Sequence, residues 1–160
     1  MNKKLLLFGL LGVAIVAAIW GGGLFASRGT HVQLKGNIQK VRIQSVEENT
    51  TAVVVDFRYT NPADYAFVVR DVTVEITTAE GEVVTGRTVA DIDAERFLAA
   101  YPDLGGKFNQ SLITREKILP GQSDDRMIAA SFELPVAVVE KRKGIRVRIE
   151  DVDRPVSFIQ

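Results

Sequence analysis

Residues 53–62 read Val-Val-Val-Asp-Phe-Arg-Tyr-Thr-Asn-Pro, and this segment sets the fold class. Apolar side chains recur at every second position from Val53 to Tyr59, which is the period of a β-strand with one face in a core. The run stops at Asn61-Pro62, because proline has no N–H to donate to a neighbouring strand. The segment therefore predicts a strand followed by a turn.

Similar alternation recurs along the chain, in residues 32–46, 67–76, 83–89, 112–118, 127–134 and 145–149, with a last short strand expected after Pro155. Glu80-Gly81-Glu82 and Leu119-Pro120-Gly121-Gln122 are turn signals between strands. Two short helices are expected, one over 93–101 with Asp93 as its N-cap and one from Pro135 to about Lys143. About seven short strands and two short helices predict a mainly β fold, an antiparallel sandwich of immunoglobulin or fibronectin-III type.

Two short motifs carry a family resemblance. Phe57 to Pro62, followed by Tyr65 and the strand over 72–76, resembles the water-stress and hypersensitive-response domain of late-embryogenesis-abundant-like proteins. Residues 119–123, leading into 130–135, are similar to a segment of bacterial membrane-anchored sandwich domains of uncharacterised function. The resemblance covers about residues 36–152. It implies an immunoglobulin-type sandwich that serves as a binding, protective or envelope-associated module, and it carries over no catalytic residue.

The chain begins with a long apolar run. Leu5 to Ala26 is 22 residues without a charged side chain, and at a rise of about 1.5 Å per residue a helix of that length crosses a hydrocarbon core of about 30 Å. A cleaved secretory signal is the competing interpretation, but its apolar core is usually about 7–15 residues long and ends in small residues. Leu24 stands where a small residue is wanted, so we expect an uncleaved transmembrane anchor.

Charge predicts how this anchor is oriented. Lys3 and Lys4 lie on a tail of four residues, and such a short basic tail stays in the cytoplasm, whereas long domains cross the membrane largely regardless of charge. We expect residues 1–4 to form a cytoplasmic tail, 5–26 the anchor, 27–35 a tether, and 36–160 the sandwich. The predicted location is the bacterial inner (plasma) membrane, spanned once, with the sandwich periplasmic or extracellular.

Composition argues against several functions. Twenty basic residues balance twenty acidic ones, so the excess positive charge that phosphate-backbone binding requires is missing, and nucleic acid is not an expected partner. The chain has no cysteine and one histidine, His31, which stands just after the anchor. One histidine without cysteine cannot supply a structural zinc site, and a histidine in the tether is poorly placed for a catalytic triad, so we expect no metal, no cofactor and no catalysis.

Two groups of residues are candidate contact sites. Tyr101, Leu104 and Phe108 stand in a glycine-containing loop, as on binding loops of rigid scaffolds, or they pack beneath the sandwich as a small satellite cluster. The other group is basic and offers contacts to anionic lipid or an acidic partner, unless it is a solvated helix end and strand face. It comprises Lys141, Arg142, Lys143, Arg146 and Arg148.

Binding or envelope scaffolding is the function that these features predict, with the membrane and an unidentified envelope protein as partners. One alternative is a subunit of a larger envelope complex that pairs through an exposed strand edge. A second is a hydrolase that uses Asp151 and Asp153, which would face the same side of a strand. For these two carboxylates, solvated turn positions are the competing interpretation.

Overall fold

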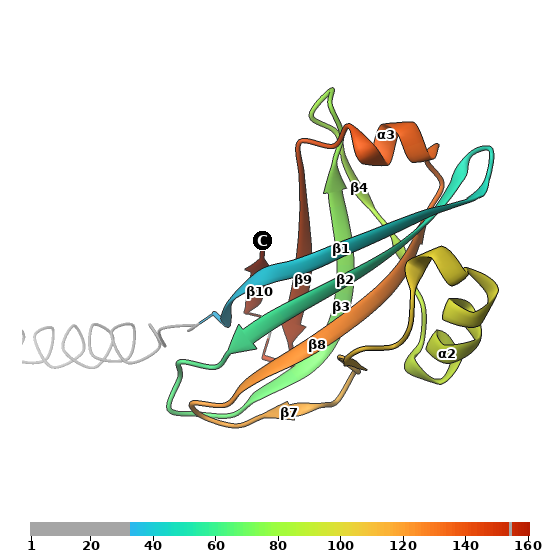
Figure 1. The fold of residues 1–160 in the computed structure, drawn as a ribbon. Coiled ribbons are helices and arrows are strands. Elements are labelled where there is room, and N and C mark those ends of the chain that lie inside the picture. Colours follow the sequence, from blue (N-terminus) through green and yellow to red (C-terminus); the bar gives the residue numbers. More distant parts are fainter. Residues whose placement is uncertain (1–32, 154) are drawn as a thin grey trace, which may run out of the picture. The chain divides into compact units, whose positions relative to one another are not determined.

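Two facing β-sheets make up the fold (Figure 1). The structure is a computed structural model that describes residues 33–153 and 155–160, so the predicted tail, the anchor and most of the tether lie outside the described residues. The described strands are β1 (Lys35–Glu47), β2 (Thr50–Thr60), β3 (Phe67–Thr77), β4 (Val83–Thr85), β5 (Arg87–Thr88), β6 (Gln110–Ser111), β7 (Lys117–Ile118), β8 (Ser123–Phe132), β9 (Gly144–Asp151) and β10 (Val156–Ile159). The helical segments there are α2 (Asp91–Ala100), a 3-10 turn over Pro102–Leu104, and α3 (Val136–Glu140).

Sheet 1 has the strand order β1-β2-β8-β5, with β6 on β8, and sheet 2 has the order β10-β9-β3-β4, with β7 on β3. The pairings are antiparallel except for the two-residue contact of β6 with β8. The predicted mainly β fold, with antiparallel sheets and two helices, is thus confirmed. Leu34 is buried and its N–H donates to Ser157 Oγ at 2.8 Å, so the sandwich takes in the last two residues of the predicted tether.

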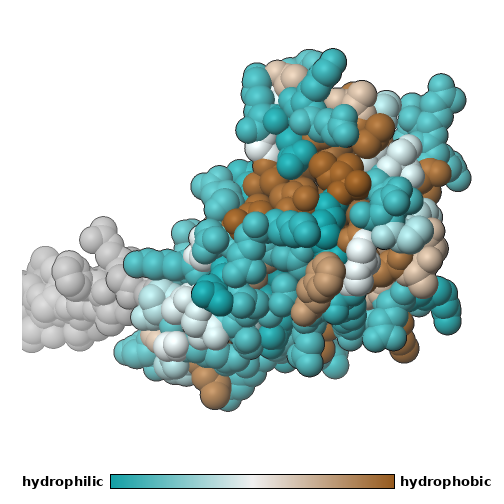
Figure 2. Space-filling view, viewed as in Figure 1, coloured by the Kyte–Doolittle hydropathy of each residue, from teal (hydrophilic) through white to brown (hydrophobic). Residues whose placement is uncertain are grey.

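The main core lies between the sheets. From sheet 1 it receives the apolar side chains that alternate along β2, from Val53 to Tyr59, all fully buried. In β3 the register against β9 shifts between Val69 and Asp71, and this bulge turns both Val69 and Val72 inward although they are three positions apart. The margin of the core reaches the surface between β1 and α3, where Figure 2 shows apolar side chains gathered.

Residues 83–89, predicted as one strand, divide between the two sheets at Gly86. On one side β4 pairs with β3 in sheet 2, and on the other β5 pairs with β8 in sheet 1. Gly86 donates its N–H to Val74 O at 2.8 Å, and a Cβ atom placed on it would lie 2.5 Å from the ring of buried Phe132. A side chain is therefore excluded where the chain crosses from one sheet to the other.

Two further predictions on the elements are wrong in detail. Residues 112–118 form a strand only at β7, because Arg115 takes a left-handed backbone conformation with φ 67° and breaks the run. The apolar alternation over 112–118 reflects burial rather than a continuous strand, since Leu112 and Ile118 both reach the core. Helix α2 begins at Asp91 rather than after Asp93, and its N-cap, Ala90, makes no side-chain capping bond.

We expect Gly86→Ala to destabilise the sandwich by about 1–3 kcal/mol, because the new methyl group overpacks against a buried ring. Gly144→Ala is the matched control, since nothing lies within 4 Å of a Cβ there. Guanidinium unfolding of the full chain in detergent measures both. Equal stability of the two variants would mean that the Gly86 crossing tolerates a side chain.

Candidate functional site

Helix α2 and the loop that follows it cover the outer face of sheet 1. The buried side chains of β2 and β8 that point away from the main core pack there against the helix and the loop. This satellite core consists of buried Ala52, Val54, Leu98, Leu104, Met127 and Ala129, with Val46, Val89, Phe97 and Tyr101 at its rim. Strand β2 is consequently buried on both faces along most of its length.

A buried ion pair fastens the loop to the sheet. Arg42 of β1 and Asp56 of β2 have side chains that are 6% exposed, and the guanidinium donates to both carboxylate oxygens, at 3.0 and 3.2 Å. The same guanidinium donates through Nη1 to two loop carbonyls, Leu104 O and, at 2.9 Å, Gly106 O. Asn109 at the end of the loop donates to Asp56 Oδ1 at 3.1 Å. We call Arg42, Asp56 and these loop contacts the clamp.

The clamp explains how two charges can be buried in this sheet. Desolvating an ion pair is costly unless further hydrogen bonds satisfy the polar atoms that remain. Here the loop supplies them, so the pair and the loop conformation depend on each other. The sequence motifs did not indicate this site. Asp56 could have signalled it, because it is the one charged residue between Thr50 and Phe57, the most apolar part of β2.

The three predicted loop residues have different surroundings. Leu104 is fully buried in the satellite core, so it cannot touch a ligand, and the satellite interpretation holds for it. Tyr101 lies at the rim, edge-on to Phe97 with their ring centroids 5.0 Å apart. Phe108 is 68% exposed and lies beneath two cations, with Arg42 Cζ 5.1 Å and Lys40 Nζ 5.9 Å from its ring centroid. Among these three, Phe108 is the most exposed.

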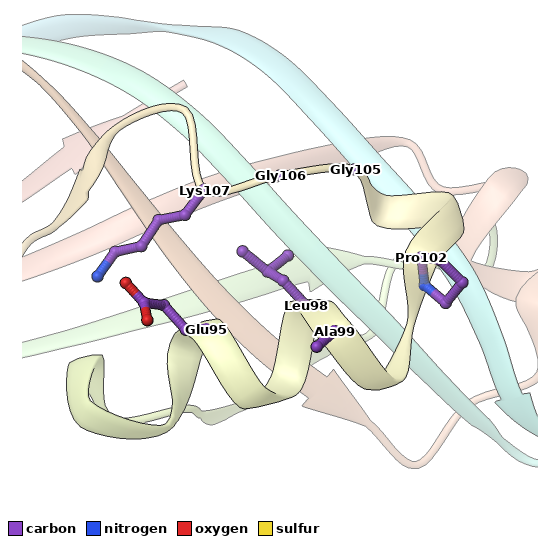
Figure 3. A pocket seen from close by; sticks show the side chains of 7 residues that line it. All are labelled: Glu95, Leu98, Ala99, Pro102, Gly105, Gly106 and Lys107. Carbon is purple, nitrogen blue, oxygen red and sulfur yellow. The ribbon is translucent and has the colours of Figure 1, made fainter.

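A groove of about 520 Å³ runs between α2 and the loop (Figure 3). Leu98, Ala99 and Pro102 give it an apolar lining, and Figure 3 shows Glu95 and Lys107 reaching toward each other at one end. Opposite the helix the wall is the backbone of Gly105 and Gly106. Gly105 has φ 74°, a conformation that favours glycine, so this wall has no side chain to narrow the groove.

Lys107 also ties the loop to the start of the helix. Its ammonium lies 2.8 Å from Asp91 Oδ1, and this contact, followed by hydrogen bonding to Ser111, lowers the pKa of the Asp91 carboxyl from its ordinary value. Asp91 lies in the first turn of α2, where a negative charge is also favoured by the helix dipole. The Arg42–Asp56 pair therefore holds the wall of the groove at Leu104 and Gly106, and the Lys107–Asp91 pair holds it at Lys107.

The five residues of the predicted basic group have different surroundings. Arg146 pairs with Glu75 at 2.6 Å and lies over the Phe158 ring, and Arg148 pairs with Glu150 at 2.9 Å. These two arginines therefore belong to a charge ladder on sheet 2. Arg142 is half-buried and donates to Val139 O, which leaves Lys141 and Lys143 as the exposed members, at the end of α3.

Asp151 and Asp153 are not a carboxylate pair on one strand face. Strand β9 ends at Asp151, which is buried and accepts the N–H of Asp153 at 3.0 Å, while Asp153 lies exposed in the turn that follows. Asp151 therefore shapes the turn. Among the described residues, no three His, Cys, Asp or Glu side chains are grouped so that they could hold a metal ion, and no helix there is long and apolar enough to span a membrane.

Comparison with known proteins identifies no family for this chain. No protein-family model matches it, and no curated protein does. A crystal structure of a conserved hypothetical protein from Bacillus anthracis superposes with a TM-score of 0.42 at 11% identity, over 80% of this chain and 88% of that one. A likeness of that size carries no functional conclusion, and the family resemblance of residues 36–152 stays a prediction.

We expect Asp56→Ala to cost about 3–5 kcal/mol, because it leaves the Arg42 guanidinium buried without its counter-charge. The double variant Arg42→Met/Asp56→Leu should recover most of that stability but free the loop, so that amide hydrogen exchange over residues 104–109 rises. Exchange mass spectrometry of the full chain measures this. Arg58→Ala, which breaks the exposed pair with Asp125, is the control and should leave the loop protected. Unchanged protection in the double variant would show that the clamp does not hold the loop.

A second prediction concerns pH. A carboxyl whose pKa is lower in the folded than in the unfolded chain stabilises the fold above its ordinary pKa of about 4, and this stabilisation is lost as the pH falls through the folded-state value. We expect wild type to exceed Asp91→Asn in free energy of unfolding near neutral pH, with the difference shrinking on acidification. Urea unfolding across the acidic range measures it. If Asp93→Asn in the same helical turn behaves identically, the Lys107 contact is not the cause.

Proposed function

We propose that this chain is a single-pass membrane protein that carries an immunoglobulin-type sandwich on the outer side of a bacterial inner membrane. Residues 5–26 serve as the uncleaved anchor, and the short basic tail before them stays in the cytoplasm. The sandwich works by binding a partner in the cell envelope, without catalysis or a cofactor. The length and lack of charge of the apolar run support the anchor.

The clamp is the observation that carries the binding role. It fixes a surface loop of the sandwich from below, through carbonyl groups at Leu104 and Gly106, rather than through the exposed side chains of that loop. A loop held in this way loses little conformational entropy when it binds, which is how preorganised binding sites gain affinity. The groove beside it is therefore a surface that a partner meets already formed.

The lining of the groove suggests the chemistry of the partner. An apolar floor at Leu98 and Pro102 suits an aliphatic side chain, and the charges of Glu95 and Lys107 suit polar groups beside it. The Gly105-Gly106 backbone allows a close approach by another main chain. We infer that the groove takes a short extended segment of a protein partner rather than a charged metabolite.

The sheet edges give less support to the alternative of strand-edge pairing. Strand β1 is a long edge of sheet 1, but its register against β2 shifts twice and it carries Lys35 and Lys40, features that protect edges from pairing. The edge strands β4 and β10 have three and four residues, and β5 has two. None of these described edges is the long, flat and uncharged strand that such pairing would use.

Site-specific photo-crosslinking in living cells tests the proposal. A photoreactive residue at Ala99, which is exposed in the groove, should trap a defined partner protein, and the same residue at Val83, which is 49% exposed on β4, should not. Protease added to intact spheroplasts should digest the sandwich in the same cells. Equal products from the two positions would contradict binding at the groove, and full protection from protease would contradict the orientation.

A further inference from the structure

One end of the sandwich is organised around a single buried asparagine. Asn61 is fully buried, and its Nδ2 donates to Tyr65 O at 2.9 Å and Ile118 O at 3.1 Å, while its Oδ1 accepts the Ala63 N–H. Its backbone bonds to Gln122 O at 2.9 Å and to the N–H of Gly121 at 2.8 Å. The turn over 61–66 and the turn over 119–122 are thereby locked together, and we call this pair the double turn.

The double turn presents apolar side chains to solvent although it is rigidly held. Leu119 is 54% exposed and Tyr65 is 40% exposed, one on each turn. Pro62 and Pro120 stand exposed beside them. Solvent-exposed turns are usually polar, so two large exposed side chains on adjoining turns stand out here.

The double turn lies beside the point where β1 begins. Lys35 at the start of β1 pairs with Thr60, the residue before Asn61, and Thr60 pairs with Ser123, the residue after the second turn. Figure 1 shows β2 ending and β8 starting at this same end of the sandwich, with α2 at the other end. The chain therefore enters the sandwich next to the exposed leucine and tyrosine.

We propose that the double turn rests on the lipid surface of the membrane that holds the anchor. This inference depends on the anchor proposed above. The eight residue steps from Ala26 to Leu34 reach at most about 29 Å when fully extended, so the start of β1, and the double turn beside it, cannot move far from the bilayer. Leucine and tyrosine are side chains that partition into the interface, tyrosine with its hydroxyl in the head-group region.

The charges at this end balance, so lipid contact here depends on the apolar side chains rather than on charge. Lys35 and Lys117 are exposed near the double turn, and in the part of the chain that the structure describes neither forms an ion pair. Asp64 is an exposed acidic residue on the double turn itself, while Glu116 and Asp124 nearby are paired with Arg126.

Site-directed fluorescence quenching tests this inference, and the absence of cysteine makes single labels simple to place. Leu119→Cys, Ile92→Cys and Val13→Cys are each labelled with bimane in the full chain. Ile92 is 88% exposed on α2 and serves as the distant control, and Val13 reports on the anchor. Each protein is reconstituted into vesicles of phosphatidylcholine and phosphatidylglycerol, with or without bromine on the acyl chains.

We expect brominated lipid to quench the labels at 13 and 119 but not the label at 92. Quenching at 13 without quenching at 119 would overturn lipid contact by the double turn and leave the anchor standing. No quenching at 13 would overturn the anchor and the inference that depends on it. Equal quenching at 119 and 92 would show that the sandwich adsorbs without a preferred end, which also contradicts the inference.

Discussion

The burial of both faces of strand β2 is the constraint on which the described structure depends. A strand of an antiparallel sheet usually has one face in a core and the other in water. In β2 every residue from Thr51 to Phe57 is buried, so the outer face needs a cover of its own. Helix α2 and its loop are that cover, and their position follows from the small side chains of Ala52 and Ala129 beneath them.

The clamp follows from the same constraint. Once the outer face of β2 is covered, Asp56 is removed from water, and Arg42 on the neighbouring strand becomes its counter-charge. Loop carbonyls complete the hydrogen bonding of the guanidinium, so the burial of the ion pair, its charge pairing and the loop conformation depend on one another. Sheet 2 contrasts with this arrangement, because its outer face carries the half-buried ladder of Arg146, Arg148 and Glu150, and no described helix covers that ladder.

The sequence predicted the two-sheet architecture because period-two alternation is a local property of each strand. It did not predict the cover, although the unbroken run Val53–Val55 is typical of a strand buried on both faces. The crossing at Gly86 and the break at Arg115 escaped prediction because each depends on a distant contact, with Phe132 and with Val69. For the same reason Leu104 and Phe108, four residues apart in one loop, could not be told apart as buried and exposed.

Nuclear magnetic resonance of the full chain in detergent tests the covered face most directly. We expect methyl contacts between Leu98 or Leu104 on the cover and Val54 or Ala129 on the sheet, together with a slowly exchanging Nε–H signal from Arg42. Absence of those methyl contacts, with an Arg42 Nε–H that exchanges as fast as the exposed guanidinium of Arg58, would contradict the covered face.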